Sequence, residues 1–428
     1  MNPPPVTRFR AAAVIDAAGV RLDSGGAVAV QDGRVVAAGD LDNLPAGETV
    51  DLGDVLLTPA HVNAHAHLEL TAVGTRPYPG GFVEWVRLLQ TERPQDDDAV
   101  YTSVREGCEL LRDAGVGYVG DIGGGRYGQT AVARALRDAR TQGVAFAEIM
   151  GLRGEQLDAA MARLETGFTS DSPADVPHVG LQPHAPYSTC PALYQACVDT
   201  GRAWGLPLCT HLAEMIEEAR FVSAAEGPFR DFVEELGLWA DDLFAHYGQG
   251  LSPVQWIQPF LAQAPWLLAH CNYVSDDDIA ILARHGASVA YCPIASEYFG
   301  HPHDGHPPHR YRDLMAAGVN VCLGTDSLVC QPGDEPHPLG LLPVMRRLRQ
   351  RDGVDPATLL AMATTRGHRA LGSLADNGTL APGAPARFTL IDLPPGYGSA
   401  SAGPLAAAID GTGRARLFEP RTPSTPAD

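Results

Sequence analysis

Short apolar runs alternate with stretches of helical periodicity through the middle of the chain. The apolar runs are residues 55–62, 116–122, 144–149, 179–181, 206–209, 266–269, 288–292 and 319–323. Helical patterns fill the gaps, for example at residues 99–114, 129–140, 191–204, 276–285 and 356–371. Eight strands that are each followed by a helix are typical of an α/β protein with a (β/α)8 TIM barrel, and we predict a barrel of about 310 residues. A doubly wound sheet also alternates, but no GxGxxG motif follows the first strand.

Both ends of the chain have the pattern of β-structure. Residues 27–30 and 35–39 flank an Asp32-Gly33 turn and predict a hairpin, and residues 388–392 form another β-rich run. Neither end is long enough to bury a core of its own, so we expect the two to pair into one small β-sandwich. The predicted organisation is residues 1–57 as the first part of the sandwich, 58–373 as the catalytic barrel, and 374–428 as the rest of the sandwich with a polar tail.

Composition narrows the range of functions. The 428 residues are 45% hydrophobic and carry a formal charge of -20, which argues against binding to nucleic acid or to an anionic membrane. The chain contains no lysine, so all 31 basic residues are arginine. This excludes Schiff-base chemistry, phosphate binding by a P-loop, and any metal pair bridged by a modified lysine.

The cysteines and the longest uncharged stretch both indicate in which cellular compartment the protein is expected. None of the eight cysteines forms a CxxC pair, which favours buried, reduced thiols. Residues 243–275 lack formal charge but contain several glutamines and three prolines, a poor composition for a membrane span. Asp16 interrupts the apolar stretch near the N-terminus, so a signal peptide is not expected. We predict a soluble cytoplasmic protein, and the sequence leaves a homo-oligomer open.

The chain has fifteen histidines and two HxH triplets, where chance predicts about 0.5. His301 and His303 lie in residues 300–309, a run rich in glycine and proline that predicts a solvated loop, with a substrate lid or adventitious metal binding as alternatives. His65 and His67 instead follow the first apolar run. The two-residue period of a strand places them on one face, where they can bind one metal or serve as polar residues at the barrel mouth.

Three later apolar runs also end in residues that can bind a metal. His211 ends the fifth strand and is followed three residues later by Glu214, His270 ends the sixth strand, and Asp326 follows the eighth. The chemistry of (β/α)8 barrels takes place at this end of the strands. Each residue alone could be an ordinary polar strand end, but together they predict a metal site.

These motifs carry a resemblance that covers almost the whole chain. The run TPAHVNAHAH at residues 58–67, with HLAE at 211–214, His270 and GTDS at 324–327, resembles the amidohydrolase superfamily, and more closely its chlorohydrolase and aminohydrolase (deaminase) branch. The resemblance implies one Zn²⁺, or alternatively Fe²⁺, bound by His65, His67, His211 and Asp326. Two-metal members usually bridge their metals with a carboxylated lysine. Because this chain has none, a site for a single metal is expected.

The resemblance also implies the catalytic roles. A metal at such a site lowers the pKa of bound water to about 7, and Asp326 would accept the proton of that water. His270 would hydrogen-bond and orient the resulting hydroxide. Glu214 would transfer protons to a ring nitrogen and to the leaving amine. The alternative for Glu214 is a structural carboxylate at a helix N-terminus.

Two segments resemble substrate contacts of deaminases for adenosine-like compounds. His184 lies in a PHxPY-like segment, and Glu84 lies where such relatives hold ribose hydroxyls, although Glu84 could also be an exposed acid on an amphipathic helix. Glu217, Phe221 and residues 227–229 follow HLAE and could lie near the pocket. The pattern of HLAE, then residues 227–229, then residues 296–301 resembles aminodeoxyfutalosine deaminases.

The preferred interpretation is a metal-dependent aminohydrolase whose partner is a small-molecule substrate. An adenine-type nucleoside such as aminodeoxyfutalosine is the expected substrate. Guanine or cytosine deamination and triazine dechlorination are alternatives within the superfamily. Peptide hydrolysis and a non-catalytic binding protein on the same fold are alternatives outside it.

Overall fold

Eight parallel strands form the centre of the protein, and they are hydrogen-bonded in chain order from β8 to β15. They are β8 (His61–Ala66), β9 (Val116–Gly123), β10 (Gln142–Ile149), β11 (His178–Pro183), β12 (Leu208–Leu212), β13 (Trp266–His270), β14 (Ser288–Tyr291) and β15 (Asn320–Leu323). A parallel bridge between Ala66 and Asp326 joins the first strand to the chain just after the last one. This computed structural model, which describes residues 5–124, 129–166, 178–303, 305–372, 378–397 and 403–420, therefore confirms the predicted (β/α)8 barrel.

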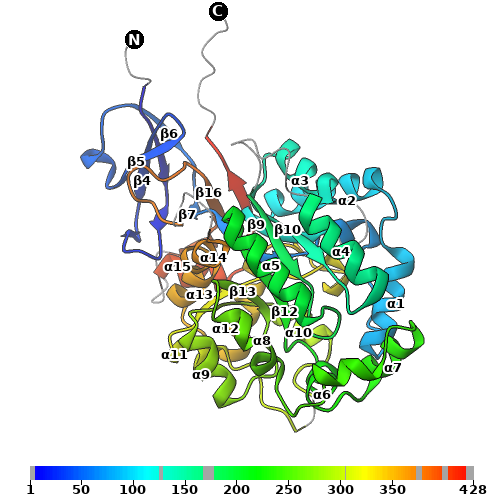
Figure 1. The fold of residues 1–428 in the computed structure, drawn as a ribbon. Coiled ribbons are helices and arrows are strands. Elements are labelled where there is room, and N and C mark those ends of the chain that lie inside the picture. The colour runs from blue at the N-terminus through cyan, green and yellow to red at the C-terminus, as the bar shows by residue number, and fades with distance from the viewer. Residues whose placement is uncertain are drawn as a thin grey trace, which may run out of the picture.

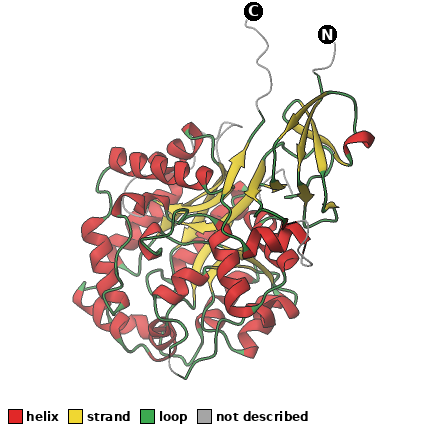
Figure 2. Ribbon diagram, turned by 180° about the vertical axis from the view of Figure 1, so that it is seen from behind, coloured by secondary structure: helices red, strands yellow, loops and turns green. Residues whose placement is uncertain are grey.

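Helices cover the outside of the barrel (Figures 1 and 2). They are α1 (Phe82–Glu92), α2 (Asp97–Asp113), α3 (Gln129–Asp138), α4 (Gly154–Thr166), α5 (Pro191–Trp204), α6 (Ile216–Ala224), α7 (Pro228–Glu235), α8 (Pro253–Leu261), α9 (Asp276–Arg284), α10 (Pro293–Tyr298), α11 (Tyr311–Ala316), α12 (Leu341–Asp352), α13 (Pro356–Ala363), α14 (Thr365–Leu371) and α15 (Gly403–Asp410). Side-chain caps fix where several of these helices begin. The Asp96 carboxylate accepts a hydrogen bond from the Ala99 N–H at 2.8 Å, and Ser252 and Ser275 form capping boxes.

Two smaller sheets pack face to face beside the barrel. One contains β1 (Thr7–Ala11), β4 (Gly26–Gln31), β5 (Arg34–Gly39) and β6 (Glu48–Asp51), and the other contains β2 (Ala13–Ile15), β3 (Arg21–Leu22), β7 (Val55–Pro59), β16 (Phe388–Asp392) and β17 (Ala415–Phe418). Strands β7 and β16 pair although they are distant in sequence, and Figure 1 shows them side by side. Phe9, Val28, Leu57 and Phe388 belong to the shared core, so both chain ends contribute to one sandwich, as predicted.

The predicted hairpin is present as β4 and β5. Its turn residues Asp32 and Gly33 have φ of 51° and 69°, a left-handed pair that matches the twist of the two strands. The sequence-based boundary between residues 57 and 58 lies inside β7, and the division into three segments stays a prediction.

Two predicted elements are each divided in the structure. Residues 55–62 form β7, which pairs with β16, and then β8, which enters the barrel; between them the Ala60 N–H donates to the carbonyl of Arg387. Residues 356–371 form α13 and α14, with a break at Thr364, whose φ is -130° and whose hydroxyl donates to the Leu360 carbonyl at 2.6 Å. Apolar periodicity continues across both breaks, so the pattern alone did not reveal them.

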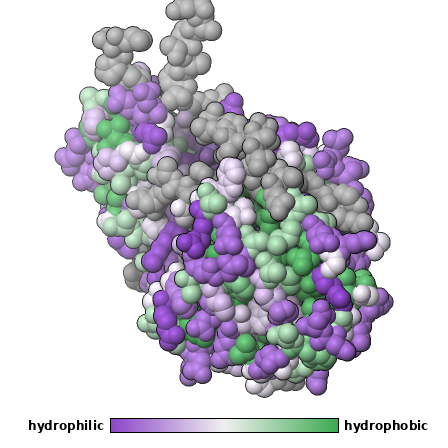
Figure 3. All heavy atoms as spheres, viewed as in Figure 1, coloured by the Kyte–Doolittle hydropathy of each residue, from purple (hydrophilic) through white to green (hydrophobic). Residues whose placement is uncertain are grey.

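The cysteines and the surface agree with the composition. All eight cysteines are buried and free, as predicted. Across the described part of the chain, no helix has the length and apolar character that crossing a membrane requires. Hydrophilic residues spread over much of the face shown in Figure 3, with hydrophobic residues interspersed among them.

Candidate metal centre

Five side chains that the sequence pattern singled out lie together at the carboxyl ends of the barrel strands. His65 is on β8 and His67 directly follows it, His211 is on β12, His270 ends β13, and Asp326 follows β15. Closure of the barrel brings the last of these to the first, because the backbone N–H of Asp326 donates to the carbonyl of His65 at 3.0 Å. The fold therefore unites residues that are up to 261 positions apart in the sequence (326 − 65).

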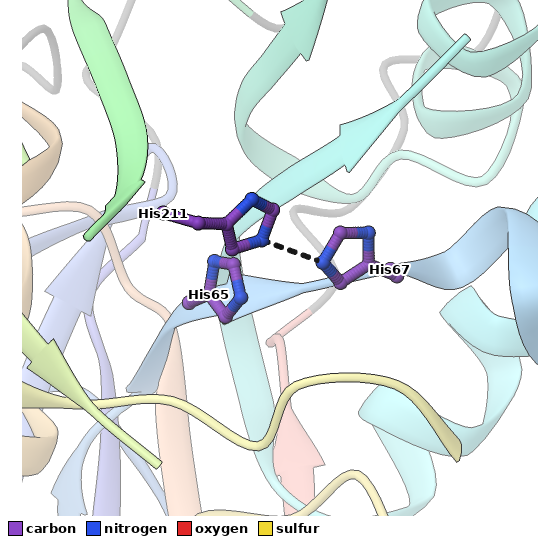
Figure 4. Close-up of side chains that lie close together, drawn as sticks. All are labelled: His65, His67 and His211. Atoms are coloured by element: carbon purple, nitrogen blue, oxygen red, sulfur yellow. Dashed lines mark hydrogen bonds between the residues drawn. The ribbon is translucent and has the colours of Figure 1, made fainter. Parts of the chain in front are cut away.

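The donor atoms of these side chains converge. In two triads that share His65, one with His67 and His211 and the other with His270 and Asp326, the potential ligand atoms all lie within 4.8 Å of one another. Figure 4 shows the rings of His65, His67 and His211 facing one another. The Nε2 atoms of His67 and His211 are 3.2 Å apart, and His67 Nε2 lies 3.7 Å from Asp326 Oδ1.

This donor set fits a divalent transition metal. Two imidazole nitrogens that bind one zinc tetrahedrally at about 2.0–2.1 Å lie about 3.3–3.4 Å apart, close to the spacing of His67 and His211. His65 is completely buried, and neither of its ring nitrogens has a hydrogen-bond partner among the described residues. Because buried polar atoms are seldom left unpaired, these orphaned nitrogens favour a bound cation.

Electrostatics keep the imidazoles in the form that binds metals. Burial lowers the pKa of His65, His67 and His211 well below the usual value, and burial with the neighbouring histidines lowers that of His270 to about 3. All four rings are therefore neutral at pH 7, as metal ligation requires. Burial also raises the pKa of Asp326 to about 7, an effect that a bound cation would oppose.

The backbone orients one of these imidazoles. His211 Nδ1 lies 2.9 Å from the side-chain amide of Gln182 and 3.2 Å from the carbonyl of His184, and a protonated Nδ1 can donate to that carbonyl. That hydrogen bond leaves the Nε2 lone pair free to bind a metal, an arrangement common among metal-ligating histidines.

Glu214 lies beside this cluster. Its Oε1 is 3.5 Å from His270 Nε2, and the side chain is buried. Burial raises the pKa of Glu214 well above its usual value, and the charges of Asp326 and Glu218 add to the effect. Glu214 can therefore hold a proton near neutral pH, which a general acid must do.

A second buried carboxylate fixes the backbone at Glu214. Glu218 accepts hydrogen bonds from the N–H of Ala213 at 3.0 Å and from the N–H of Glu214 at 2.9 Å. Ala213 has a φ of 48°, and His270 and Asp326 have φ of 71° and 63°. Left-handed backbone at non-glycine residues costs about 1–3 kcal/mol each, and strain of this kind concentrates at functional sites.

The two predicted substrate contacts differ in their surroundings. The ring of His184 lies 4.9 Å from that of His211 by centroids, and its Nδ1 lies 2.6 Å from Ser188 Oγ, so it borders the metal cluster directly. Glu84 is exposed in the first turn of α1. Burial raises the pKa of Tyr78 to about 12, and the charges of Glu217 and then Glu84 contribute to this rise, so Glu84 is near enough to Tyr78 to influence it.

Besides Glu218, the structure adds two buried acids that the sequence analysis missed. Asp121 on β9 accepts a hydrogen bond at 2.8 Å from the N–H of Leu68, the residue after His67, and so holds the metal-binding segment. Glu148 on β10 places its Oε1 3.7 Å from His184 Nε2. Both are polar residues at the ends of apolar barrel strands, the same signal that identified His211 and His270.

The histidine-rich loop needs a correction. Pro302 and residues 305–308 are exposed, as the prediction of a solvated loop requires, but His301 and His309 are buried, with 7% and 6% of their surface exposed. His309 Nε2 lies 2.8 Å from the carbonyl of His270, and His301 Nε2 lies 3.1 Å from that of Asn272. The loop is thus attached to the segment that carries His270, while Asp304 lies outside the described residues.

A comparison with protein families decides the assignment. The model of the amidohydrolase family matches residues 56–417. This chain belongs to the amidohydrolase family. The resemblance read from the sequence motifs is therefore confirmed, and the match spans both the barrel and the strand β16 of the sandwich.

Individual relatives within the family are deaminases. The 5-methylthioadenosine/S-adenosylhomocysteine deaminase of Symbiobacterium thermophilum is 28% identical over 389 residues, which cover 86% of this chain and 80% of that protein. The aminodeoxyfutalosine deaminase of Deinococcus radiodurans is 28% identical over 369 residues, 82% of each chain. An adenosine deaminase structure from Xanthomonas campestris with bound zinc shares the fold, with a TM-score of 0.71, 20% identity, and coverage of 97% of this chain and 91% of that chain. The predicted class of enzyme, a hydrolase of the amidohydrolase family, agrees with these relatives.

Proposed function

We propose that this amidohydrolase is a deaminase that holds one divalent metal and releases ammonia from the adenine ring of an adenosine-type nucleoside. The observation that carries the proposal is the convergence of four neutral imidazoles and one carboxylate beside a buried acid, Glu214. Two relatives of 28% identity are named as deaminases of adenosine-type nucleosides, which supports the substrate class.

Each residue of the cluster has a separate role in the proposed reaction. His65, His67, His211 and Asp326 would hold the metal, with Zn²⁺ the first candidate and Fe²⁺ the second. When bound, such a metal supplies a water that ionises near neutral pH. His270 orients the attacking group, and Asp326 accepts its proton.

Glu214 transfers protons to and from the substrate. It donates its proton to a ring nitrogen of adenine, which makes the neighbouring carbon more electrophilic. As a carboxylate it then takes up the proton of the hydroxyl group added to that carbon and passes it to the departing amine, while the carbon–nitrogen bond breaks and the ring carbonyl forms. The proton that Asp326 accepted from the water afterwards returns to Glu214. A carboxyl group that stays protonated near pH 7 suits this role, and burial of Glu214 provides that condition.

The nucleoside would extend from the cluster toward His184 and Glu84. His184 borders His211, and the ring of Tyr187, 5.5 Å from that of His184, stacks on Phe229 at 4.2 Å. Such an aromatic wall suits a purine. Glu84 would accept hydrogen bonds from the two ribose hydroxyls.

Ammonia release from a panel of substrates tests the proposal. The panel contains adenosine, 5-methylthioadenosine, S-adenosylhomocysteine, aminodeoxyfutalosine, adenine, guanine and cytosine, each with protein loaded with zinc. We expect turnover of one or more adenosine-type nucleosides that exceeds turnover of every free base. Turnover confined to guanine or cytosine would transfer the assignment to a base deaminase, and the absence of turnover on all seven compounds would refute it.

A further inference from the structure

Three of the buried polar atoms that lack a partner belong to neighbouring segments, which follow β12, β13 and β14. They are Glu217 Oε2, Tyr273 Oη and His303 Nε2, and none forms a hydrogen bond with the described residues. More than about nine in ten buried polar atoms in native proteins are paired. A group of three that are not marks a place where another molecule supplies the partners.

The three residues belong to neighbouring segments. Glu217 lies in the first turn of α6, three residues after Glu214, and Tyr273 lies three residues after His270. The two loops are joined by a hydrogen bond from the Tyr273 N–H to the carbonyl of Ala213 at 3.1 Å. The rings of Tyr273 and His303 are nearly parallel, with an interplanar angle of 16° and centroids 6.3 Å apart.

Electrostatic effects link this group to the candidate active site. Burial raises the pKa of Tyr273, the nearby backbone of His303 lowers it in part, and the carboxylate of Glu217 raises it again. Burial raises the pKa of Tyr78 to about 12 with contributions from Glu217, Glu84 and Glu214, in that order. The geometry agrees, because Glu218, the next residue after Glu217, accepts a hydrogen bond from the N–H of Glu214 at 2.9 Å.

The chemistry of the group is complementary to a zwitterion. Glu217 offers a carboxylate, which accepts hydrogen bonds and attracts a cation, and it forms no ion pair with the described residues. Tyr273 and His303 offer an O–H and a ring N–H, which can donate to an anion. An α-amino acid carries an ammonium and a carboxylate on one carbon and matches both sides of this arrangement.

We propose that Glu217, Tyr273 and His303 form a subsite that binds the amino-acid end of a nucleoside's 5′ substituent, as in S-adenosylhomocysteine. The ammonium binds Glu217, and the carboxylate binds Tyr273 and His303. This proposal rests on the proposed function, because it requires the adenine ring to lie at the metal cluster. It names the residues that choose among nucleosides and leaves the chemistry at Glu214 unchanged.

A comparison of two substrates measures what the subsite contributes to recognition. S-Adenosylhomocysteine and 5-methylthioadenosine share the adenosine and the 5′ sulfur, and only the former has the amino-acid end. We would measure kcat/KM for ammonia release from both with the wild-type zinc protein and with Glu217→Gln and Tyr273→Phe. The measured quantity is the selectivity, the kcat/KM for S-adenosylhomocysteine divided by that for 5-methylthioadenosine.

We expect Glu217→Gln to lower this selectivity by about 10–100-fold, since it removes a hydrogen bond between charged groups. Tyr273→Phe removes one donor and should lower it by about 2–10-fold. Glu226→Gln, at an exposed acid after α6, and Tyr101→Phe, whose hydroxyl contacts Asp138 on α3, are the matched controls and should keep the wild-type selectivity.

The outcomes separate the two proposals. If the wild type deaminates both nucleosides and both variants keep its selectivity, the subsite is refuted while the proposed function stands. If the wild type deaminates neither nucleoside nor adenosine, the proposed function fails and the subsite fails with it. Thermal unfolding of each variant identifies one that does not fold, and in that case the other variant decides.

Discussion

The strand ends of the barrel and the helices and loops around its mouth hold their side chains in different ways. His65, His211 and Asp326 are buried on or next to strands, and hydrogen bonds across the barrel closure fix Asp326 relative to His65. Glu84, on α1, is exposed, and Glu217, on α6, is partly buried. The comparison indicates that the sheet fixes the proposed metal ligands, and we expect the helices and loops to determine which substrate is accepted.

The two regions also differ in what burial does to their charges. Burial raises the pKa of Asp326 to about 7 and that of Glu214 well above its usual value, so burial favours the protonated form of both groups. At the mouth, the side chain of Glu84 is exposed and that of Glu217 is only partly buried. Substitutions in the first region should therefore abolish chemistry, and substitutions in the second should change selectivity.

The largest effect is expected for a metal ligand. Replacing a residue that only hydrogen-bonds to a metal ligand lowers metal affinity by up to about 100-fold. His65→Ala removes a ligand itself, so it should weaken metal binding by more than about 100-fold, and activity should disappear with the metal. Metal analysis of the purified variant measures this. The exposed histidine variant His246→Ala is the control and should keep its metal. A His65→Ala protein with full metal content would contradict the assigned site.

Glu214→Gln should separate the chemistry from metal binding. The variant keeps the size of the side chain but cannot transfer a proton, so kcat should fall by about 10²–10⁴ while metal content stays the same. Steady-state kinetics and metal analysis of one preparation provide both values, with Glu226→Gln as the control. Near wild-type kcat would show that Glu214 is only a structural acid at the start of the α6 segment.

A smaller and more selective effect is expected at the mouth. Glu84→Ala should lower kcat/KM by about 10–150-fold for nucleosides, because it removes a charged acceptor of the ribose hydroxyls, and it should affect free adenine little. The measurement is kcat/KM for adenosine and adenine side by side. Equal losses on both compounds would refute the ribose contact and leave the metal site untouched.

The smallest effect concerns the support of Glu214. Glu218→Ala leaves the N–H groups of Ala213 and Glu214 without their acceptor, so the free energy of unfolding should fall by about 1–3 kcal/mol. Denaturant unfolding of the metal-loaded protein measures the change. Glu217→Ala, on the same helix, removes no hydrogen bond to the described residues and should cost less. A larger loss for Glu217→Ala than for Glu218→Ala would reverse this ranking.

The same contrast explains what could be predicted from the sequence. His65, His211 and His270 end apolar strands, and the period of a strand together with barrel topology is enough to bring them together. The roles of Glu218 and Asp121 could not be predicted from the sequence, because they depend on which backbone N–H groups lie near these carboxylates in the folded chain. Local patterns predict elements and their ends, whereas hydrogen bonds between distant segments require the fold.

The loop at residues 300–309 shows the same limit. Its glycines and prolines correctly predicted irregular structure, but they gave no sign that His309 would contact the carbonyl of His270. The division of residues 356–371 at Thr364 was invisible for a related reason, because the apolar period continues while a side-chain hydroxyl competes for a backbone carbonyl.

Titration of metal-stripped protein with zinc tests the central claim most directly. Ammonia release from the preferred nucleoside would be recorded after each addition to protein of known concentration. One site built from His65, His67, His211 and Asp326, in a chain without lysine, predicts that activity rises linearly and stops rising at one zinc per chain. Activity that needs two zinc ions per chain, or that is already complete without any metal, would contradict it.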